Sequence, residues 1–117
     1  MDESRPIFQQ IAEQIENDII SGVLPGETQV PSTNEFAAFH RINPATAGKG
    51  VNLLVDEGIL YKKRGIGMFV AEGAQARLVA KRRDQFQEQF IAPLLAEATK
   101  LGISSADVAA MVQKGAK

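Results

Sequence analysis

The 117-residue sequence contains no cysteine, only one histidine and no long apolar run. The absence of cysteine excludes a disulfide framework and any thiolate metal ligand or nucleophile, and it fits a reducing cytoplasm, where we expect the protein to work. No apolar stretch approaches the roughly 20 residues that a membrane helix needs. The N-terminus, MDESRPIFQQ, carries acids and lacks the apolar core of a signal peptide. We therefore expect no association with a membrane.

Features that would indicate an enzyme or a metalloprotein are also missing. His40, the only histidine, has no accompanying cluster of His, Asp and Glu, so the pattern predicts no metal site and no cofactor. Ser32 has no base at a spacing suited to activating it as a nucleophile. The short RGIG segment lacks the Gly-Lys-Ser/Thr of a phosphate-binding loop. The sequence thus predicts no enzymatic activity.

Charge is nearly balanced over the whole chain, with a net −1, but it is unevenly distributed. Residues 1–72 contain 6 Lys and Arg against 10 Asp and Glu, a net −4, whereas residues 73–117 contain 7 against 4, a net +3. Between positions 41 and 64 the cations outnumber the acids, five to two. Because phosphate binding depends on positive charge gathered on one face, the small net charge does not exclude a nucleic-acid partner.

Three helices are expected in the first half of the chain. Isoleucines recur every four residues near the N-terminus, which predicts an amphipathic helix from about Pro6 to Gly22. Ser32 and Glu35 form a capping-box pattern for a second helix over about 33–40. The pair Asn43-Pro44 is typical of a helix start and opens a third helix that ends near Gly58. Since only about two residues separate the second and third helices, the pattern predicts a helix-turn-helix.

A basic hairpin is expected directly after the third helix. The β-prone runs 59–61 and 68–70 flank the sequence KKRGIG, in which Gly65 and Gly67 supply the backbone freedom for a tight turn. This order predicts a winged helix-turn-helix domain over residues 1–72. A long helical pattern interrupted by Pro93, followed by a short last helix, predicts a helical tail over 73–117. The expected fold class is α+β and mainly α.

The third helix is the candidate element for reading DNA bases, and the hairpin is the candidate phosphate contact. Short side chains at the head of the helix would let its first turn approach base edges closely. Lys49, one turn later, can reach a phosphate or a guanine. The residues so assigned are Asn43, Ala45, Thr46, Lys49 and Asn52 in the helix and Lys62, Lys63 and Arg64 in the hairpin. The pattern favours double-stranded DNA as the partner, and a winged helix used only for protein contacts is the alternative.

Two glycines stand inside the third helix, where each costs about 1 kcal/mol relative to alanine. Gly48 can permit close approach to DNA. The alternative is tight packing against another helix, above all at Gly50, or simple tolerance of the glycines.

Four segments, VPSTNEFA, INPATAGKG, LVDEGILY and KKRGIGMFV, together resemble the DNA-binding domain of the GntR family of bacterial transcription regulators. The resemblance covers about residues 5–72. By position, it implies DNA contacts from Ser32, Asn34, Asn43, Pro44, Ala45, Thr46, Gly48, Arg64, Gly65, Ile66 and Gly67, with Lys49 adjacent. Family members commonly carry glycine where Arg41 stands, so Arg41 is expected to adopt a left-handed backbone conformation if the corner keeps that geometry.

The tail indicates a subgroup of the family. Residues 73–117 are too few for the large effector domain that GntR proteins usually carry, and the tail and the NPAT sequence are similar to the YtrA-type subfamily, in which a helical tail serves mainly as a dimer interface. A tail this short cannot bury all of its apolar residues on itself, which favours pairing in a homodimer. The candidate dimerisation residues are Leu78, Arg82, Phe86, Phe90, Leu94, Leu95 and Met111.

A two-fold dimer predicts a palindromic operator and repression by occlusion of a promoter. Two alternatives for the tail stay open. It could pack back on the first helix, or Phe86, Phe90 and Met111 could line a pocket for a small effector whose chemistry the sequence does not define.

Overall fold

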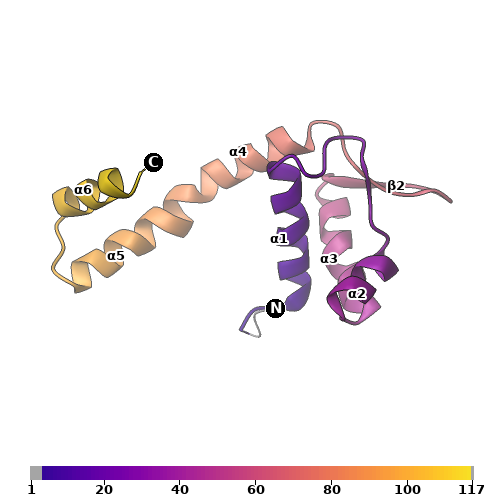
Figure 1. Cartoon of the computed structure of the whole chain (residues 1–117), viewed down its shortest axis with the longest axis horizontal. Helices are drawn as coiled ribbons and strands as arrows, with labels where there is room; N and C mark the ends of the chain where they lie inside the picture. Colours follow the sequence, from indigo (N-terminus) through magenta and orange to yellow (C-terminus); the bar gives the residue numbers. More distant parts are fainter. Residues whose placement is uncertain (1–3, 117) are drawn as a thin grey trace. The chain divides into compact units, whose positions relative to one another are not determined.

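The computed structural model describes residues 4–116 and divides into two compact units. The first, here called the winged unit, extends to residue 79, and the second, the tail unit, begins at residue 80. The elements of the winged unit are α1 (Ile7–Ile20), β1 (Gln29–Val30), α2 (Thr33–His40), α3 (Pro44–Asp56), β2 (Leu60–Lys63), β3 (Gly67–Val70) and the start of α4 (Ala74–Phe86) (Figure 1). This order confirms the predicted winged helix-turn-helix and the mainly helical α+β class.

Three helices form the core of the winged unit, with α3 packed against both α1 and α2 (Figure 1). Three of the four isoleucines in the stripe of α1 are buried there, as the four-residue spacing predicts, whereas Ile7 in the first turn is 38% exposed. The buried side chains that make this contact layer include Ile11, Ile15, Ile19, Ala47, Val51 and Leu54. The opposite face of α3 is thereby left available for a partner.

Local hydrogen bonds fix where α2 and α3 begin. Ser32 Oγ accepts from the Glu35 amide at 3.1 Å, and Glu35 Oε1 accepts from the Ser32 amide at 3.2 Å, so the predicted capping box is confirmed. Asn43 Oδ1 accepts from the Ala45 amide at 2.7 Å, and Pro44 follows in the first turn. Arg41, between the helices, has φ 56° and ψ 48°, which confirms the expected left-handed corner.

The wing is a three-stranded antiparallel sheet in the order β1-β3-β2. The hairpin of β2 and β3 was predicted, whereas β1 was not, because two residues are too few to show a periodic pattern. Gln29 pairs with Phe69, and Phe69 pairs with Tyr61. Directly opposed residues share a face of a sheet, so these three side chains form one row across the wing.

The start of α4 belongs to the winged unit. Ala74 and Leu78 are buried in its core. Arg77 Nη2 donates to the Gly58 carbonyl at 2.6 Å, and Gln75 Nε2 donates to the Ile20 carbonyl at 2.9 Å. The first bond ties α4 to the turn that follows α3, and the second ties it to the last residue of α1. The prediction that Leu78 lies on a dimer face is corrected accordingly, because its side chain is fully buried in this core.

The tail unit contains the rest of α4, the π-helical turn η1 (Gln87–Ile91), α5 (Ala92–Lys100) and α6 (Ser105–Gly115). The π turn ends two residues before Pro93, the residue expected to kink or divide this helical stretch. A proline cannot donate to the carbonyl four residues earlier and crowds it, and a wider turn before the proline relieves that crowding. Among residues 4–116, no helix is long and apolar enough to cross a membrane.

Candidate nucleic-acid interface

The head of α3 presents small groups to solvent. Asn43, Pro44 and Ala45 are exposed, and Thr46 is half-buried. Because the Asn43 side-chain oxygen is occupied by the Ala45 amide, its NH₂ group is the part left to donate to a base edge or a phosphate. The positive end of the α3 dipole lies at the same place, which favours an anion there.

Further along α3, Lys49 and Asn52 are exposed. The Lys49 ammonium lies 4.1 Å from the centroid of the Phe8 ring, so α1 supports the lysine through a cation–π contact. Phe8 was not among the residues predicted for the site. No local pattern marks it, because the contact joins two helices that are far apart in the chain.

The two glycines of α3 have different surroundings. A Cβ at Gly50 would lie 2.6 Å from the Phe8 carbonyl oxygen and 3.1 Å from carbons of Ile11, so close packing on α1 requires glycine there. This confirms the packing alternative for Gly50. A Cβ at Gly48 would meet only the Thr33 methyl at 3.5 Å, an ordinary contact. Packing therefore does not explain Gly48, and its role in close approach to DNA stays a prediction.

The N-terminus of α2 supplies the remaining helical candidates, Ser32 and Asn34, and both are exposed. The Ser32 oxygen accepts a hydrogen bond within the capping box, and its hydroxyl hydrogen can still be donated to a phosphate. A capped helix start and a hydroxyl donor are both groups that suit a phosphate, so a DNA contact from this end of α2 stays a prediction.

The tip of the wing is exposed from Lys62 to Ile66, and it turns sharply between β2 and β3. Gly65 has φ +79° and Gly67 has φ +146°, conformations that favour glycine, so both glycines shape the turn. The Lys63 ammonium lies 4.5 Å from the Phe69 ring centroid, and this holds it over the sheet. Arg64 stands at the start of the turn.

Two residues in or near β1, Gln29 and Glu27, support the wing, and neither was among the predicted site residues. Gln29 Nε2 donates to the Ile66 carbonyl at 3.1 Å. The Tyr61 hydroxyl donates to a carboxylate oxygen of Glu27, and this bond raises the pKa of Tyr61. The partners are 37 and 34 residues apart, so only the strand register brings them together.

His40 packs against two aromatic rings of its own helix. Its ring centroid lies 4.3 Å from that of Phe36 and 4.9 Å from that of Phe39. Within the described residues, no three His, Cys, Asp or Glu side chains gather closely enough to hold a metal ion.

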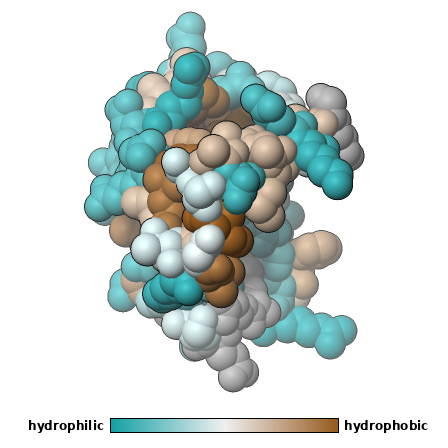
Figure 2. Space-filling view, turned by 90° about the vertical axis from the view of Figure 1, so that its left-hand side faces the viewer, coloured by the Kyte–Doolittle hydropathy of each residue, from teal (hydrophilic) through white to brown (hydrophobic). Residues whose placement is uncertain are grey.

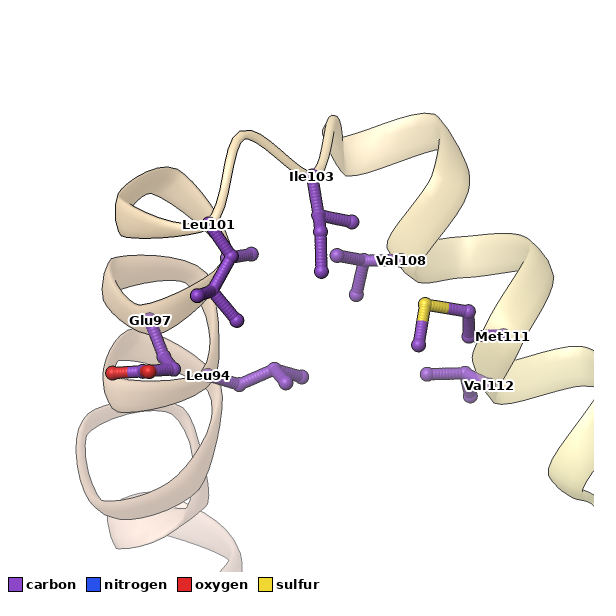
Figure 3. A pocket seen from close by; sticks show the side chains of 8 residues that line it. Leu94, Glu97, Leu101, Ile103, Val108, Met111 and Val112 are labelled. Atoms are coloured by element: carbon purple, nitrogen blue, oxygen red, sulfur yellow. The ribbon is translucent and has the colours of Figure 1, made fainter.

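The tail unit carries an apolar surface that is largely open. Leu94 of α5 points toward α6, Met111 and Val112 point back toward α5, and Glu97 points away from the groove of about 270 Å³ between them (Figure 3). Figure 2, seen from the side where α5 and α6 lie in Figure 1, shows brown apolar atoms gathered between teal hydrophilic ones.

The predicted dimerisation residues fall into three groups. Phe86 and Phe90 are 53% and 61% exposed, with ring centroids 5.5 Å apart. Leu94, Leu95 and Met111 are also exposed, Arg82 is half-buried, and Leu78 belongs to the winged unit instead. Leu101 and Val112 are exposed as well, and neither was among the predicted dimerisation residues.

The family model for "Bacterial regulatory proteins, gntR family" matches residues 7–70, from the start of α1 to the end of β3. The chain belongs to the GntR family. This is a family of regulatory proteins and not of enzymes.

Individual GntR proteins resemble the chain over different lengths. The HTH-type transcriptional repressor YtrA of Bacillus subtilis (strain 168) is 33% identical over 86 residues, which are 74% of this chain and 66% of that repressor. This chain thus spans slightly less than two thirds of YtrA. A GntR family transcriptional regulator from Listeria monocytogenes has a structure similar to this one with a TM-score of 0.83 and 30% identity, covering 99% of this chain and 100% of that one.

A DNA complex is also among the similar structures. The DNA-binding domain of AraR bound to its operator ORR3 has a TM-score of 0.53 and 31% identity, covering 55% of this chain and 77% of that one.

Proposed function

We propose that this GntR protein is a transcription regulator that binds a palindromic DNA operator as a homodimer and represses the adjoining promoter by occluding it. The observation that carries the proposal is an exposed, capped first turn of α3 in the same compact unit as an exposed cationic wing. Two relatives support it, because YtrA is a transcriptional repressor and the AraR domain is bound to an operator. Such a regulator would act in the bacterial cytoplasm, where the DNA is.

The head of α3 would read the major groove with small groups. The Asn43 amide can donate to an acceptor on a base or phosphate, and the Ala45 methyl can contact a thymine methyl. The Thr46 hydroxyl can donate or accept. Gly48, which packing does not need, leaves the backbone free to come close to the groove. Specificity in this account comes from close fit rather than from long arginine side chains.

The wing would contribute affinity. Arg64 at the exposed turn contacts the sugar-phosphate backbone, and Lys62 and Lys63 add positive charge beside it. Each phosphate neutralised releases counterions, so binding weakens as salt rises. With about three to five phosphates neutralised by each protomer, we expect the dimer to show a log–log salt slope of about −5 to −9.

The tail unit supports the homodimer. Its buried residues in the described chain are only Ala98 and Val108, whereas Phe86, Phe90 and Met111 are more than half exposed. A helical segment with so little core of its own needs another surface to cover these side chains. A second copy related by a two-fold axis supplies one, and it would pair two recognition helices on a palindrome.

The direct test is selection of duplexes by the purified protein from fragmented genomic DNA, followed by anisotropy titrations at several salt concentrations. We expect enrichment of a palindromic site and a salt slope in the range given above. Failure to enrich any site, together with a slope near zero, would overturn the DNA-binding proposal and favour a protein-interaction role for the winged unit. Sedimentation at micromolar concentration tests the second part, and a strictly monomeric species would remove the homodimer.

A further inference from the structure

Gln29 links the edge of the sheet to the tip of the wing. Its backbone lies in β1, which pairs with β3 at Gln29–Phe69 and Val30–Met68. The side chain reaches past the end of that pairing and donates through Nε2 to the Ile66 carbonyl at 3.1 Å. The tip therefore has an anchor outside its own hairpin, and a two-stranded hairpin without such support is only marginally ordered in water.

Gly67 makes room for this anchor. A Cβ at Gly67 would lie 2.5 Å from Gln29 Nε2, which is closer than Cβ atoms in proteins approach another heavy atom. The missing side chain thus opens the path along which the Gln29 amide reaches Ile66. Glycine is therefore favoured at position 67 for two reasons: it leaves room for the Gln29 side chain, and it readily adopts the φ of +146° found there.

We infer that Gln29 is a positioning residue for the wing, because it holds the Ile66 carbonyl and so fixes the turn from which Arg64 reaches DNA. The inference rests on the proposed function. A turn held in its binding conformation loses less conformational freedom when it meets the phosphates. Gln29 itself need not touch DNA, and its effect should pass through Arg64.

The test uses Gln29→Met, which keeps the length of the side chain but cannot donate a hydrogen bond. The matched control is Gln75→Met, which removes the same kind of bond, from a side-chain amide to the Ile20 carbonyl at 2.9 Å, away from the wing. The probe is a duplex that the wild-type protein selects from a random library. We expect Gln29→Met to weaken binding by about 3- to 10-fold per protomer. Gln75→Met should change it less than about 2-fold at a temperature where both variants are folded.

Coupling to Arg64 separates positioning from a general loss of structure. In an Arg64→Ala background, Gln29→Met should weaken binding by less than about 2-fold, because the contact that it positions is already gone. If the two substitutions multiply instead, Gln29 does not act through Arg64 and the inference is overturned. Equal binding by the wild type and Gln29→Met would overturn it as well.

A measurement without DNA completes the test. The Ile66 amide donates to the Lys63 carbonyl at 2.9 Å within the turn. Hydrogen exchange at this amide should quicken in Gln29→Met and stay unchanged in Gln75→Met, and equal exchange in the wild type and Gln29→Met would refute the anchor. The proposed function fails differently, since it is overturned if the wild-type protein selects no duplex at all.

Discussion

Replacing Gly50 by alanine should destabilise the protein, although alanine is the better helix former. The added Cβ would lie 2.6 Å from the Phe8 carbonyl oxygen, which belongs to the α1 backbone and cannot turn aside like a side chain. Overpacking of a fixed core costs about 1–3 kcal/mol or more. Alanine recovers about 1 kcal/mol through its helix propensity. We therefore expect Gly50→Ala to lower the free energy of unfolding by up to about 2 kcal/mol.

Gly48→Ala is the matched control, two residues away in the same helix. Its Cβ would meet only the Thr33 methyl at 3.5 Å, so the propensity gain of up to about 1 kcal/mol should remain. Urea unfolding followed by circular dichroism at one protomer concentration gives both values. The packing argument is refuted if Gly50→Ala is as stable as Gly48→Ala. The same Gly48→Ala protein should bind DNA more weakly if the missing side chain at Gly48 lets the α3 backbone come close to the major groove.

Four further predictions concern the wing, the tail and the core of the winged unit. Arg64→Ala should weaken binding to all duplexes nearly equally and reduce the salt slope by about 1 per protomer, and an unchanged slope would contradict a phosphate contact. Tyr61, the only tyrosine, should titrate above pH 10.0 by ultraviolet absorbance and move back in Glu27→Gln. Since its pKa is raised on folding, this bond stabilises the fold below pH 10 and is lost as the pH rises through the folded-state pKa; equal midpoints in the two proteins would exclude the bond. Phe90→Glu should convert the sedimenting dimer to monomer, whereas Leu78→Ala should lower the free energy of unfolding by about 2–5 kcal/mol, and a dimer that survives Phe90→Glu would exclude this interface.

The parts of the fold that were predictable depend on neighbours in the chain. Ser32 with Glu35, and Asn43 with Pro44, place the helix starts because caps act over two or three residues. The isoleucine stripe of α1 follows from helical spacing. The left-handed Arg41 was expected for another reason, namely the resemblance to GntR proteins, which commonly carry glycine at this position.

The parts that were missed depend on register between distant segments. Gln29 and Ile66, Glu27 and Tyr61, and Lys49 and Phe8 each meet only after the sheet and helices have packed. Leu78 shows the converse error. Its spacing fits the stripe of Phe86 and Phe90. However, α4 begins in the core of the winged unit and continues into the tail unit, and its apolar residues keep the same helical spacing in both units. Periodicity identifies the apolar face and not what covers it.

The central claim, that the first turn of α3 lies against DNA, is tested most directly by Ala45→Glu. Ala45 is exposed in the first turn of α3, where a carboxylate interacts favourably with the helix dipole by about 0.3–1 kcal/mol, so the variant should be at least as stable as the wild type. Against base edges and phosphates the same charge costs several kcal/mol. We predict a loss of at least about 100-fold in affinity for the wild-type-selected duplex, measured by anisotropy titration. Wild-type affinity in this folded variant would contradict the account.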